Sequence, residues 1–354
     1  MPPADLTATL KQQVQAAYAC TTPLQIVGGN SKAFYGRTTR GTVLDVSGHG
    51  GIISYEPTEL VITARAGTPL DDIEAALAEQ GQMLPFEPPH WGPAATLGGT
   101  VACNLSGPRR PYAGSARDFV LGCHMLNGKG ELLHFGGEVM KNVAGYDAAR
   151  LMAGALGTLG VLLDISLKVL PAPQQELTLV QPCTLAEALM RMNRLAGQPI
   201  PLSASAWIDG QLYLRFSGAA TAVAAVKARE PSEVLADAAN FWRGLRELHT
   251  PFFVDAGKLW RIALPPTAAQ PDLPGDWLVE WGGAQRWLKS NADVEQVRAR
   301  VLASGGHATL VHGASASKAV FQPLPPVLWQ LHQRLKQAFD PAGILNPGRM
   351  YEGL

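Results

Sequence analysis

Glycine is concentrated in three separate clusters of this 354-residue chain. The densest lies within residues 96–118, TLGGTVACNLSGPRRPYAGSARD, which contain a Gly-Gly pair, a Ser-Gly turn and three arginines. Glycine costs backbone entropy, so such a concentration is typical of a chain that passes close to something a side chain would block. A flat, phosphate-bearing cofactor would fit that description. A set of tight turns in a compact α/β domain is the alternative that glycine content alone leaves open.

The first cluster, GGNSK, begins at Gly28 and Gly29 and follows a predicted strand at 24–27. Consecutive amides in a glycine-rich turn can form a concave nest for pyrophosphate oxygens, to which Asn30 and Ser31 would add hydrogen bonds. The turn matches neither GxxxxGK(S/T) nor GxGxxG followed by an acidic residue about 20 positions on. Taken alone, this motif favours a purely structural turn, and a phosphate contact is the alternative that the other two clusters support.

In the second cluster, Thr96, Gly98 and Gly99 are predicted to wrap the ring or the diphosphate edge of such a cofactor. Ser106 and Gly107 would offer amides nearby.

Two arginines of this cluster, Arg109 and Arg110, lie in a rigid Pro-Arg-Arg-Pro frame within a charge-poor region. That rigidity suits anion recognition or docking to a partner protein. We expect the pair at the mouth of the cofactor site or on a subunit contact.

In the third cluster, Gly154, Gly157 and Gly160 recur at every third position, and Thr158 can donate a hydrogen bond. Contacts between packed helices are the alternative for this spacing. Residues 141–147 carry a polar group denser than a core helix would tolerate, so we expect it to face a cleft: Lys141, Asn142, Tyr146 and Asp147.

Composition excludes several classes of protein. Lys plus Arg and Asp plus Glu both number 29, so no global field favours nucleic acid or an anionic membrane. The four cysteines are far apart and have no zinc or iron–sulfur spacing, so any such centre must belong to another polypeptide. No basic start followed by an apolar run and no stretch of about 18 apolar residues is present. We expect a soluble cytoplasmic protein without a metal site.

The elements expected in the first half include a helix at 5–19, a strand at 24–27, and a helix capped by Thr68 and ended by Gly81. Asn127-Gly128 predicts a hairpin. Near Pro171-Ala172-Pro173 the glycine density drops, and the rest reads as a smaller α+β domain with antiparallel strands.

Together the three clusters have a family signature. From about residue 20 to 172 the chain resembles the FAD-binding domain of the vanillyl-alcohol oxidase (PCMH) type, through IVGGNSKAF, TARAGTPL, TLGGTVACNLSG, YAGSARDFVLG and KNVAGYDAARLMAGALGTLGVL. FDPAGILNPGRM is similar to the C-terminal signature of FAD-linked oxidases that act on 2-hydroxy acids. End to end, the chain resembles the smaller FAD-binding subunits of bacterial glycolate oxidase (dehydrogenase) complexes.

The resemblance implies an α+β fold. A bipartite PCMH-type FAD-binding domain (1–172) would have two α/β lobes, a small one with a parallel sheet and a second with a mixed sheet. A small α+β cap domain with an antiparallel sheet (173–335) and a C-terminal segment returning to the flavin (336–354) would follow. The implied FAD contacts are Gly28, Gly29, Asn30, Ser31, Thr96, Gly98, Gly99, Ser106, Gly157, Thr158, Gly160 and Val161. Covalent members carry a histidine in the first loop, which this chain lacks, so we expect non-covalent FAD.

The implied function is that of an FAD-dependent oxidoreductase acting on CH–OH groups within a complex that oxidises glycolate to glyoxylate. The implied partners are a larger FAD-containing subunit and an iron–sulfur subunit that passes electrons onward. Membrane contact would be only peripheral, through the complex, at the inner face of the cell membrane.

One departure from the family concerns catalysis. Related dehydrogenases carry a GHxGDGNxH-like segment, whereas this chain has GGHATLVH at 305–312, and we assign no catalytic base. His307 and His312 are expected to face solvent or to pack. Two alternatives stay open: a stand-alone FAD oxidoreductase of another small 2-hydroxy acid or alcohol, and a flavin-binding scaffold without its own catalysis.

Overall fold

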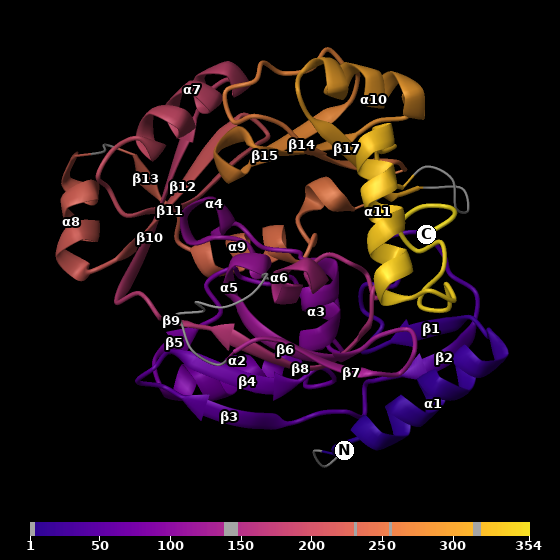
Figure 1. The fold of residues 1–354 in the computed structure, drawn as a ribbon. Coiled ribbons are helices and arrows are strands. Elements are labelled where there is room, and N and C mark those ends of the chain that lie inside the picture. Colours follow the sequence, from indigo (N-terminus) through magenta and orange to yellow (C-terminus); the bar gives the residue numbers. More distant parts are fainter. Residues whose placement is uncertain (1–3, 138–147, 230–231, 255–256, 314–319) are drawn as a thin grey trace. The chain divides into compact units, whose positions relative to one another are not determined.

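The computed structural model describes residues 4–137, 148–229, 232–254, 257–313 and 320–354 (Figure 1). The chain divides into two compact units. Unit 1 comprises Met1–Leu105, Ser115–Pro171 and Pro323–Leu354, and unit 2 comprises Ser106–Gly114 and Ala172–Gln322. In this division residues 106–114 group with unit 2, and residues from Pro323 onward group with unit 1. The expected domain bounds at 172 and 335 stay a prediction.

The first lobe of unit 1 consists of α1 (Thr7–Cys20) and a parallel pair of strands, β1 (Leu24–Val27) and β2 (Thr42–Asp45). The helix forms where it was expected because Leu10, Val14 and Ala17 recur at helical spacing and bury one face. Leu345, from the far end of the chain, adds a parallel bridge to Leu24. The expected small parallel sheet is confirmed.

The second lobe is a five-stranded sheet in the order β3-β4-β8-β6-β7. Its described strands pair only antiparallel, so the expected mixed sheet is wrong. The hairpin at Asn127 joins β6 to β7, although the residue with positive φ is Gly130 (φ +72) rather than Gly128. The strands are β3 (Ile52–Glu56), β4 (Val61–Arg65), β6 (Val120–Leu126), β7 (Leu132–Gly136) and β8 (Val161–Lys168).

Helix α2 of unit 1 buries one apolar face. In α2, Leu70, Ile73 and Leu77 are fully buried. The sequence predicted Thr68 as the N-cap of this helix, and that prediction is wrong. The Thr68 hydroxyl donates to the Arg65 carbonyl at 2.7 Å, and Pro69 occupies the N-cap position. The helices are α2 (Leu70–Glu79), α3 (Leu97–Cys103), α5 (Ala116–Phe119), α6 (Ala148–Met152) and α11 (Pro326–Phe339), and the short strands β5 (Gln82–Met83) and β9 (Leu170–Pro171) pair with each other.

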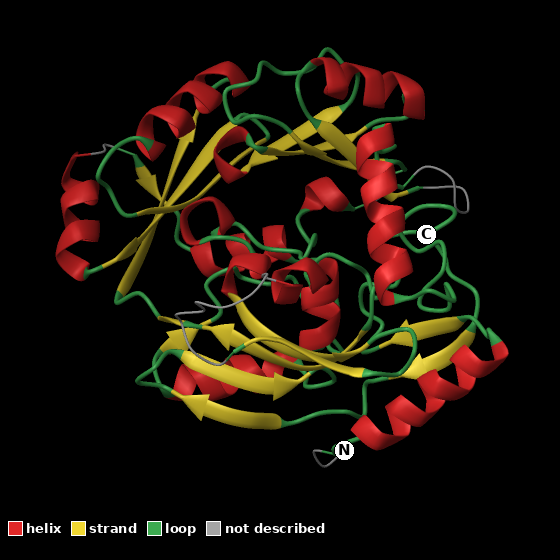
Figure 2. Ribbon diagram, in the orientation of Figure 1, coloured by secondary structure: helices red, strands yellow, loops and turns green. Residues whose placement is uncertain are grey.

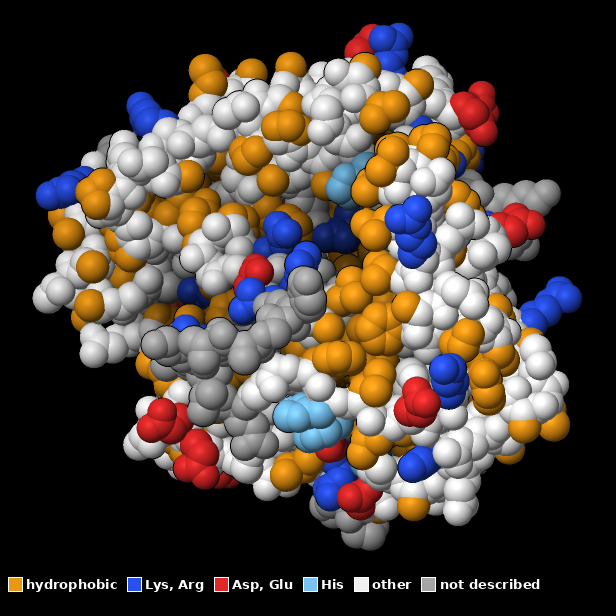
Figure 3. Space-filling model, in the orientation of Figure 1, with side chains coloured by type: hydrophobic (Ala, Val, Ile, Leu, Met, Phe, Trp, Pro, Cys, Tyr) orange, Lys and Arg blue, Asp and Glu red, His pale blue; other side chains and the backbone are white. Residues whose placement is uncertain are grey.

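Helix α11 has an apolar outer face. Val327, Leu328 and Leu331 are exposed on it, and hydrophobic side chains gather over this helix in the space-filling view (Figure 3). The opposite side of α11 buries Lys336.

Unit 2 is built on an eight-stranded sheet in the order β13-β10-β12-β11-β15-β16-β14-β17, with antiparallel pairing, as expected. Helices α7, α8 and α10 pack on one face of it, and α9 covers the other face with Trp242 (Figure 2). The strands are β10 (Gln175–Pro182), β11 (Leu202–Ile208), β12 (Gln211–Gly218), β13 (Glu233–Val234), β14 (Leu259–Ala263), β15 (Asp276–Glu280), β16 (Gln285–Lys289) and β17 (His307–His312). The helices are α4 (Arg110–Ala113), α7 (Leu185–Ala196), α8 (Ala220–Arg229), α9 (Ala238–Arg246) and α10 (Val294–Ala303), with 3-10 turns η1 (Pro251–Phe253) and η2 (Trp281–Gly283).

None of the helices in the described part of the chain combines the length and the apolar character that a membrane crossing requires.

Candidate functional site

All three glycine clusters meet at one cavity in unit 1. Its volume is about 250 Å³. Its wall comes from four segments that are far apart in the chain, within residues 25–39, 96–103, 152–162 and 346–349, together with Val46 and Ala66.

Most of the residues expected from the sequence line this cavity: Gly28, Gly29, Asn30, Ser31, Thr96, Gly98, Gly99, Gly157 and Gly160. Three others lie elsewhere. The Thr158 hydroxyl donates to the Ala155 carbonyl at 2.7 Å, Val161 is fully buried in a core cluster formed by both lobes of unit 1, and Ser106 belongs to unit 2. The polar group formed by Lys141, Asn142, Tyr146 and Asp147 lies outside the described residues.

The turn after β1 presents unused amides to the cavity. Asn30 has a left-handed backbone (φ +57), which turns the chain sharply at this point. Among the described residues, the hydrogen bonds include none donated by the amides of Gly28, Gly29, Asn30 or Ser31. A run of such amides in a left-handed turn is a backbone nest that accepts an anion.

Close backbone contacts explain two of the glycines. A Cβ on Gly29 would overlap the carbonyl oxygen of Ala94, and a Cβ on Gly98 would lie 2.7 Å from the Cβ of Ala66. Any larger residue would push these loops apart, so the cavity wall requires glycine at both positions.

The C-terminal signature fastens the cavity wall together. Asn346 accepts from the Ile26 amide at 2.8 Å and donates to the Leu156 carbonyl at 2.7 Å. Arg349 donates to three carbonyls of the first glycine-rich segment, those of Ala33, Tyr35 and Arg37, at 2.7–2.9 Å. The segment therefore ties two distant loops of the cavity to the end of the chain.

A buried ion pair holds that segment in turn. The Lys336 ammonium lies 2.8 Å from the Asp340 carboxylate and donates to the carbonyls of Thr158 and Leu345. Asp340 also accepts the amides of Ile344 and Leu345. Burial lowers the pKa of Lys336, and the bond to Asp340 opposes that shift.

The charged side chains that line the described part of the cavity are all positive. Among the described residues that line the cavity, Lys32 and Arg349 are cationic, and none is an aspartate, a glutamate or a histidine. Burial lowers the pKa of Arg349 and raises the pKa of the Cys103 thiol, on the same wall, to about 11. Two cations with no facing carboxylate in a largely apolar wall favour an anionic ligand. The amide nest, the close glycine contacts and this charge all fit FAD, which carries a diphosphate between two flat rings.

The described contacts of Arg109 and Arg110 lie within unit 2. The Arg109 guanidinium forms an ion pair with Glu176, and Arg110 stacks 4.4 Å from the ring centroid of Trp281. Placement of the pair at the mouth of the flavin site or on a subunit contact stays a prediction. His307 and His312 lie exposed at the two ends of β17.

The sequence did not predict the residues that pack against the first glycine-rich loop. Lys32 donates to the His90 carbonyl at 3.1 Å, and the Trp91 ring lies 5.1 Å from that of Phe34. Arg349 and Cys103 were also missed as lining residues. The proline-flanked PPHWGP at 88–93 was the available signal, because a tryptophan held between prolines and a glycine is typical of a fixed packing segment.

A two-lobed unit whose glycine-rich loops converge on a cationic cavity, followed by a unit with an antiparallel sheet, defines a class of two-part FAD-binding proteins. Residues 3–136 match the family described as FAD binding domain. Residues 278–350 match the family of FAD linked oxidases, C-terminal domain.

Individual relatives narrow the family to which the chain belongs. Glycolate oxidase subunit GlcE of Escherichia coli (strain K12) is 52% identical over 350 residues, which cover 99% of each chain. Glycolate oxidase subunit GlcD of Bacillus subtilis (strain 168) is 32% identical over 142 residues, 40% of this chain and 30% of the relative. The chain therefore belongs to the FAD-linked oxidases, in the family of the glycolate oxidase subunit GlcE, and its cofactor is FAD.

A solved structure shares the fold. Alkyldihydroxyacetonephosphate synthase has a TM-score of 0.66 to this chain at 17% identity, covering 96% of this chain and 74% of the synthase.

Proposed function

We propose that this chain is the FAD-binding subunit of a glycolate oxidase (dehydrogenase) complex and takes part in the oxidation of glycolate to glyoxylate. The observation that carries the proposal is the relative named glycolate oxidase subunit GlcE, which matches 99% of the chain at 52% identity. The cavity in unit 1 supports it, because its lining suits the cofactor of such an enzyme.

In this proposal the residues of unit 1 hold FAD in distinct ways. The free amides of Gly28, Gly29, Asn30 and Ser31 bind the diphosphate, and Lys32 and Arg349 balance its charge. Thr96, Gly98 and Gly99 line the cavity beside this turn, and Gly157 and Gly160 let the chain lie close to the cofactor. When bound, FAD supplies the acceptor for the two electrons removed from the substrate.

The FAD is proposed to be non-covalent. No histidine lines the cavity among the described residues, and the one lining cysteine, Cys103, has a thiol pKa of about 11. A thiol with that pKa is almost wholly protonated near neutral pH and is therefore a poor nucleophile.

The oxidation of glycolate is proposed to need other subunits. Removing a hydride from a hydroxy acid requires a group that takes the hydroxyl proton. The described lining of the cavity contains no carboxylate and no imidazole for this role. We therefore place the substrate on a larger FAD-containing subunit, with an iron–sulfur subunit carrying electrons onward from the complex at the cytoplasmic face of the membrane.

The test uses the full chain purified alone with its flavin. We expect a visible flavin spectrum, release of all flavin by acid precipitation, and no bleaching by glycolate until the larger and iron–sulfur subunits are added. Bleaching by the chain alone would instead support the stand-alone oxidoreductase, and a colourless chain that takes up no FAD would contradict the proposal.

Gly29→Ala tests the proposed site directly. Because the new Cβ would overlap the Ala94 carbonyl, FAD affinity should fall by about tenfold or more. Gly197→Ala is the matched control, because a Cβ there meets its nearest atom, the Arg194 carbonyl oxygen, at 3.7 Å. Equal FAD affinity in the two variants would contradict the site.

A further inference from the structure

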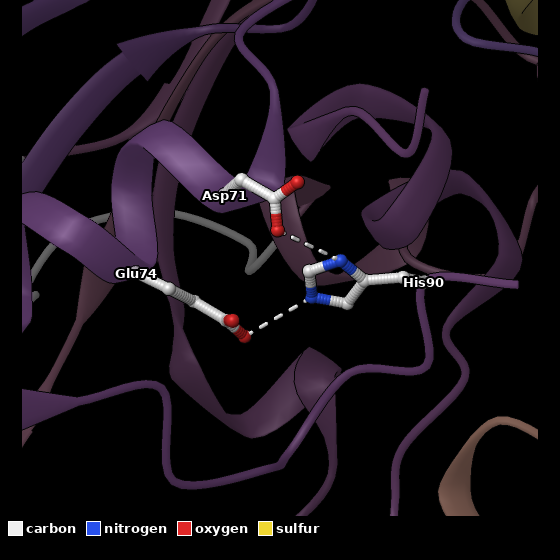
Figure 4. A group of neighbouring side chains, drawn as sticks. All are labelled: Asp71, Glu74 and His90. Carbon is white, nitrogen blue, oxygen red and sulfur yellow. Dashed lines mark ion pairs between the residues drawn. The ribbon is translucent and has the colours of Figure 1, made fainter. Parts of the chain in front are cut away.

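A histidine outside the cavity is held between two carboxylates. His90 lies in the loop before α3, and Asp71 and Glu74 lie in the first turns of α2 (Figure 4). The Asp71 carboxylate is 3.3 Å from Nδ1 of the ring, and the Glu74 carboxylate is 3.3 Å from Nε2. The His90 side chain is only 13% exposed, so the ring is fixed against the helix rather than extended into solvent.

The arrangement of Asp71, Glu74 and His90 suits two carboxylates that fix a ring, here called the clamp, better than a metal site. The three groups offer ligand atoms within 4.8 Å of one another. The two carboxylates, however, face different nitrogens of the same ring, and one metal ion can bind only one of them. Each carboxylate instead contacts its own ring nitrogen at 3.3 Å, so the ring is held from two sides.

The backbone of the same residue reaches the cavity. The Lys32 ammonium donates to the His90 carbonyl at 3.1 Å and lies 3.5 Å from the Ser31 hydroxyl. Lys32 lines the cavity and is 6% exposed. Arg349, the other cation, and Cys103 line the same cavity. The position of the His90 carbonyl therefore sets where a buried positive charge lies relative to the ligand.

The residues next to His90 pack on the same loop. The Trp91 ring lies 5.1 Å from Phe34 and 6.3 Å from Tyr35. Trp91 has a left-handed backbone (φ +49), an unfavourable state for an aromatic residue that needs support from its surroundings. The clamp on His90, one residue earlier, supplies such support.

We propose that His90 is a positioning residue for FAD. Its ring, held by Asp71 and Glu74, fixes the carbonyl that directs the Lys32 ammonium toward the cofactor's phosphates. The inference rests on the proposed function of the cavity. Neither the glycine-rich loops nor the family resemblance points to the α2 carboxylates, which lie outside the cavity lining.

A double-mutant cycle on the full chain tests whether His90 acts through Lys32. The FAD dissociation constant is measured for the wild type, His90→Gln, Lys32→Met and the double variant. We expect Lys32→Met to weaken FAD binding by about tenfold and His90→Gln by about three- to fivefold. In the Lys32→Met background the His90 substitution should have no further effect, because the charge that it directs is gone. Thermal midpoints of the apo proteins are recorded alongside.

The helix side of the clamp provides a second variant that keeps His90. Asp71→Asn combined with Glu74→Gln should weaken FAD binding as His90→Gln does. Asp72→Asn combined with Glu79→Gln is the matched control, because both residues are exposed on the same helix and lie outside the cluster. The control should bind FAD as the wild type does.

Several outcomes would overturn the inference. The first is unchanged FAD affinity in both His90→Gln and the Asp71/Glu74 variant. The second is a His90→Gln substitution that weakens FAD binding equally whether position 32 is lysine or methionine. The third is weaker FAD binding by the wild type after addition of EDTA. A wild-type chain that binds no FAD at all would overturn the proposed function as well, which distinguishes the two failures.

Discussion

Desolvation controls the chemistry of individual thiols in this protein. Burial raises the pKa of Cys103 to about 11 and that of Cys123 to about 12, whereas Cys20 is exposed on α1. For Cys103 the neighbouring charges of Lys32 and Arg349 oppose the shift but do not reverse it. Because the thiolate is the reactive form, the three cysteines should differ sharply in reactivity.

We expect a thiol reagent such as DTNB at pH 8 to modify Cys20 quickly and Cys103 and Cys123 on the order of 100-fold more slowly, because their thiolate fractions are that much smaller. Liberated thiolate absorbance and peptide mapping measure the rates. Because Cys183 is half-buried, the test compares Cys183→Ser with Cys20→Ser/Cys183→Ser. The double substitution should remove the fast phase, and a fast phase that survives it would show that the buried thiols are reactive.

The same shifts predict a loss of stability in alkali. Between about pH 9 and the folded pKa values of about 11 and 12, the thiols ionise in the unfolded chain but stay protonated in the folded one. The folded state then binds more protons, so the free energy of unfolding falls as pH rises, by about 1.4 kcal/mol per pH unit for each thiol. Cys123→Ala should make that decline shallower in urea titrations, whereas Cys20→Ala should not.

At the residue scale the sequence identified the lining glycines better than their partners. Glycine at 28, 29, 98 and 99 was selected because glycine marks close backbone approach, and these residues do line the cavity. Thr158 and Val161 were selected with them because they are neighbours in the motif, but one bonds to its own turn and the other lies in the core. A motif gives positions along the chain, whereas the direction of each side chain depends on strand register.

At the scale of elements, local patterns predicted the helices and hairpins. α1 and the β6–β7 hairpin form where the apolar spacing and the Asn127-Gly128 turn predict them. Sheet order was not predictable in this way. β8 lies between β4 and β6 although it follows both in the sequence, because that pairing depends on long-range packing. The mixed sheet that the resemblance implied for the second lobe was wrong for the same reason.

The C-terminal segment joins distant loops of the cavity wall, and Asn346 forms two of the hydrogen bonds that do so. Asn346→Ala leaves the Ile26 amide and the Leu156 carbonyl without their partner, so we expect the free energy of unfolding to fall by about 2–4 kcal/mol. Asn346→Asp keeps the acceptor for Ile26 but cannot donate to Leu156, and it brings a negative charge to the cavity. It should therefore weaken FAD binding more than it lowers stability.

Urea unfolding and FAD titration measure these two effects separately. Asn240→Ala is a suitable control, because Asn240 bonds only at the surface of α9 in unit 2. An Asn346→Ala protein as stable as this control would show that the C-terminal segment does not fasten the wall of the cavity.

At the scale of the whole molecule, the site depends on convergence that no single stretch of sequence contains. Ile26 and Asn346 are 320 positions apart, yet they share a hydrogen bond at the cavity. Resemblance to a family made the convergence of the three clusters an expectation. It did not predict that the α2 carboxylates Asp71 and Glu74 contact His90, or that the His90 carbonyl accepts from Lys32. These contacts depend on how loops pack and not on a motif.

Hydrogen exchange tests this convergence in one experiment. Added FAD should slow exchange together in the segments that line the cavity, within 25–33, 96–103, 155–160 and 346–349. The amides of Gly28 to Ser31 should change most, because they have no acceptor within the described chain and exchange quickly until the diphosphate binds them. Strand β12 of unit 2, which does not line the cavity, is the internal reference. Protection limited to one glycine cluster would mean that FAD binds a single loop, and the cavity would then have to be abandoned as its site.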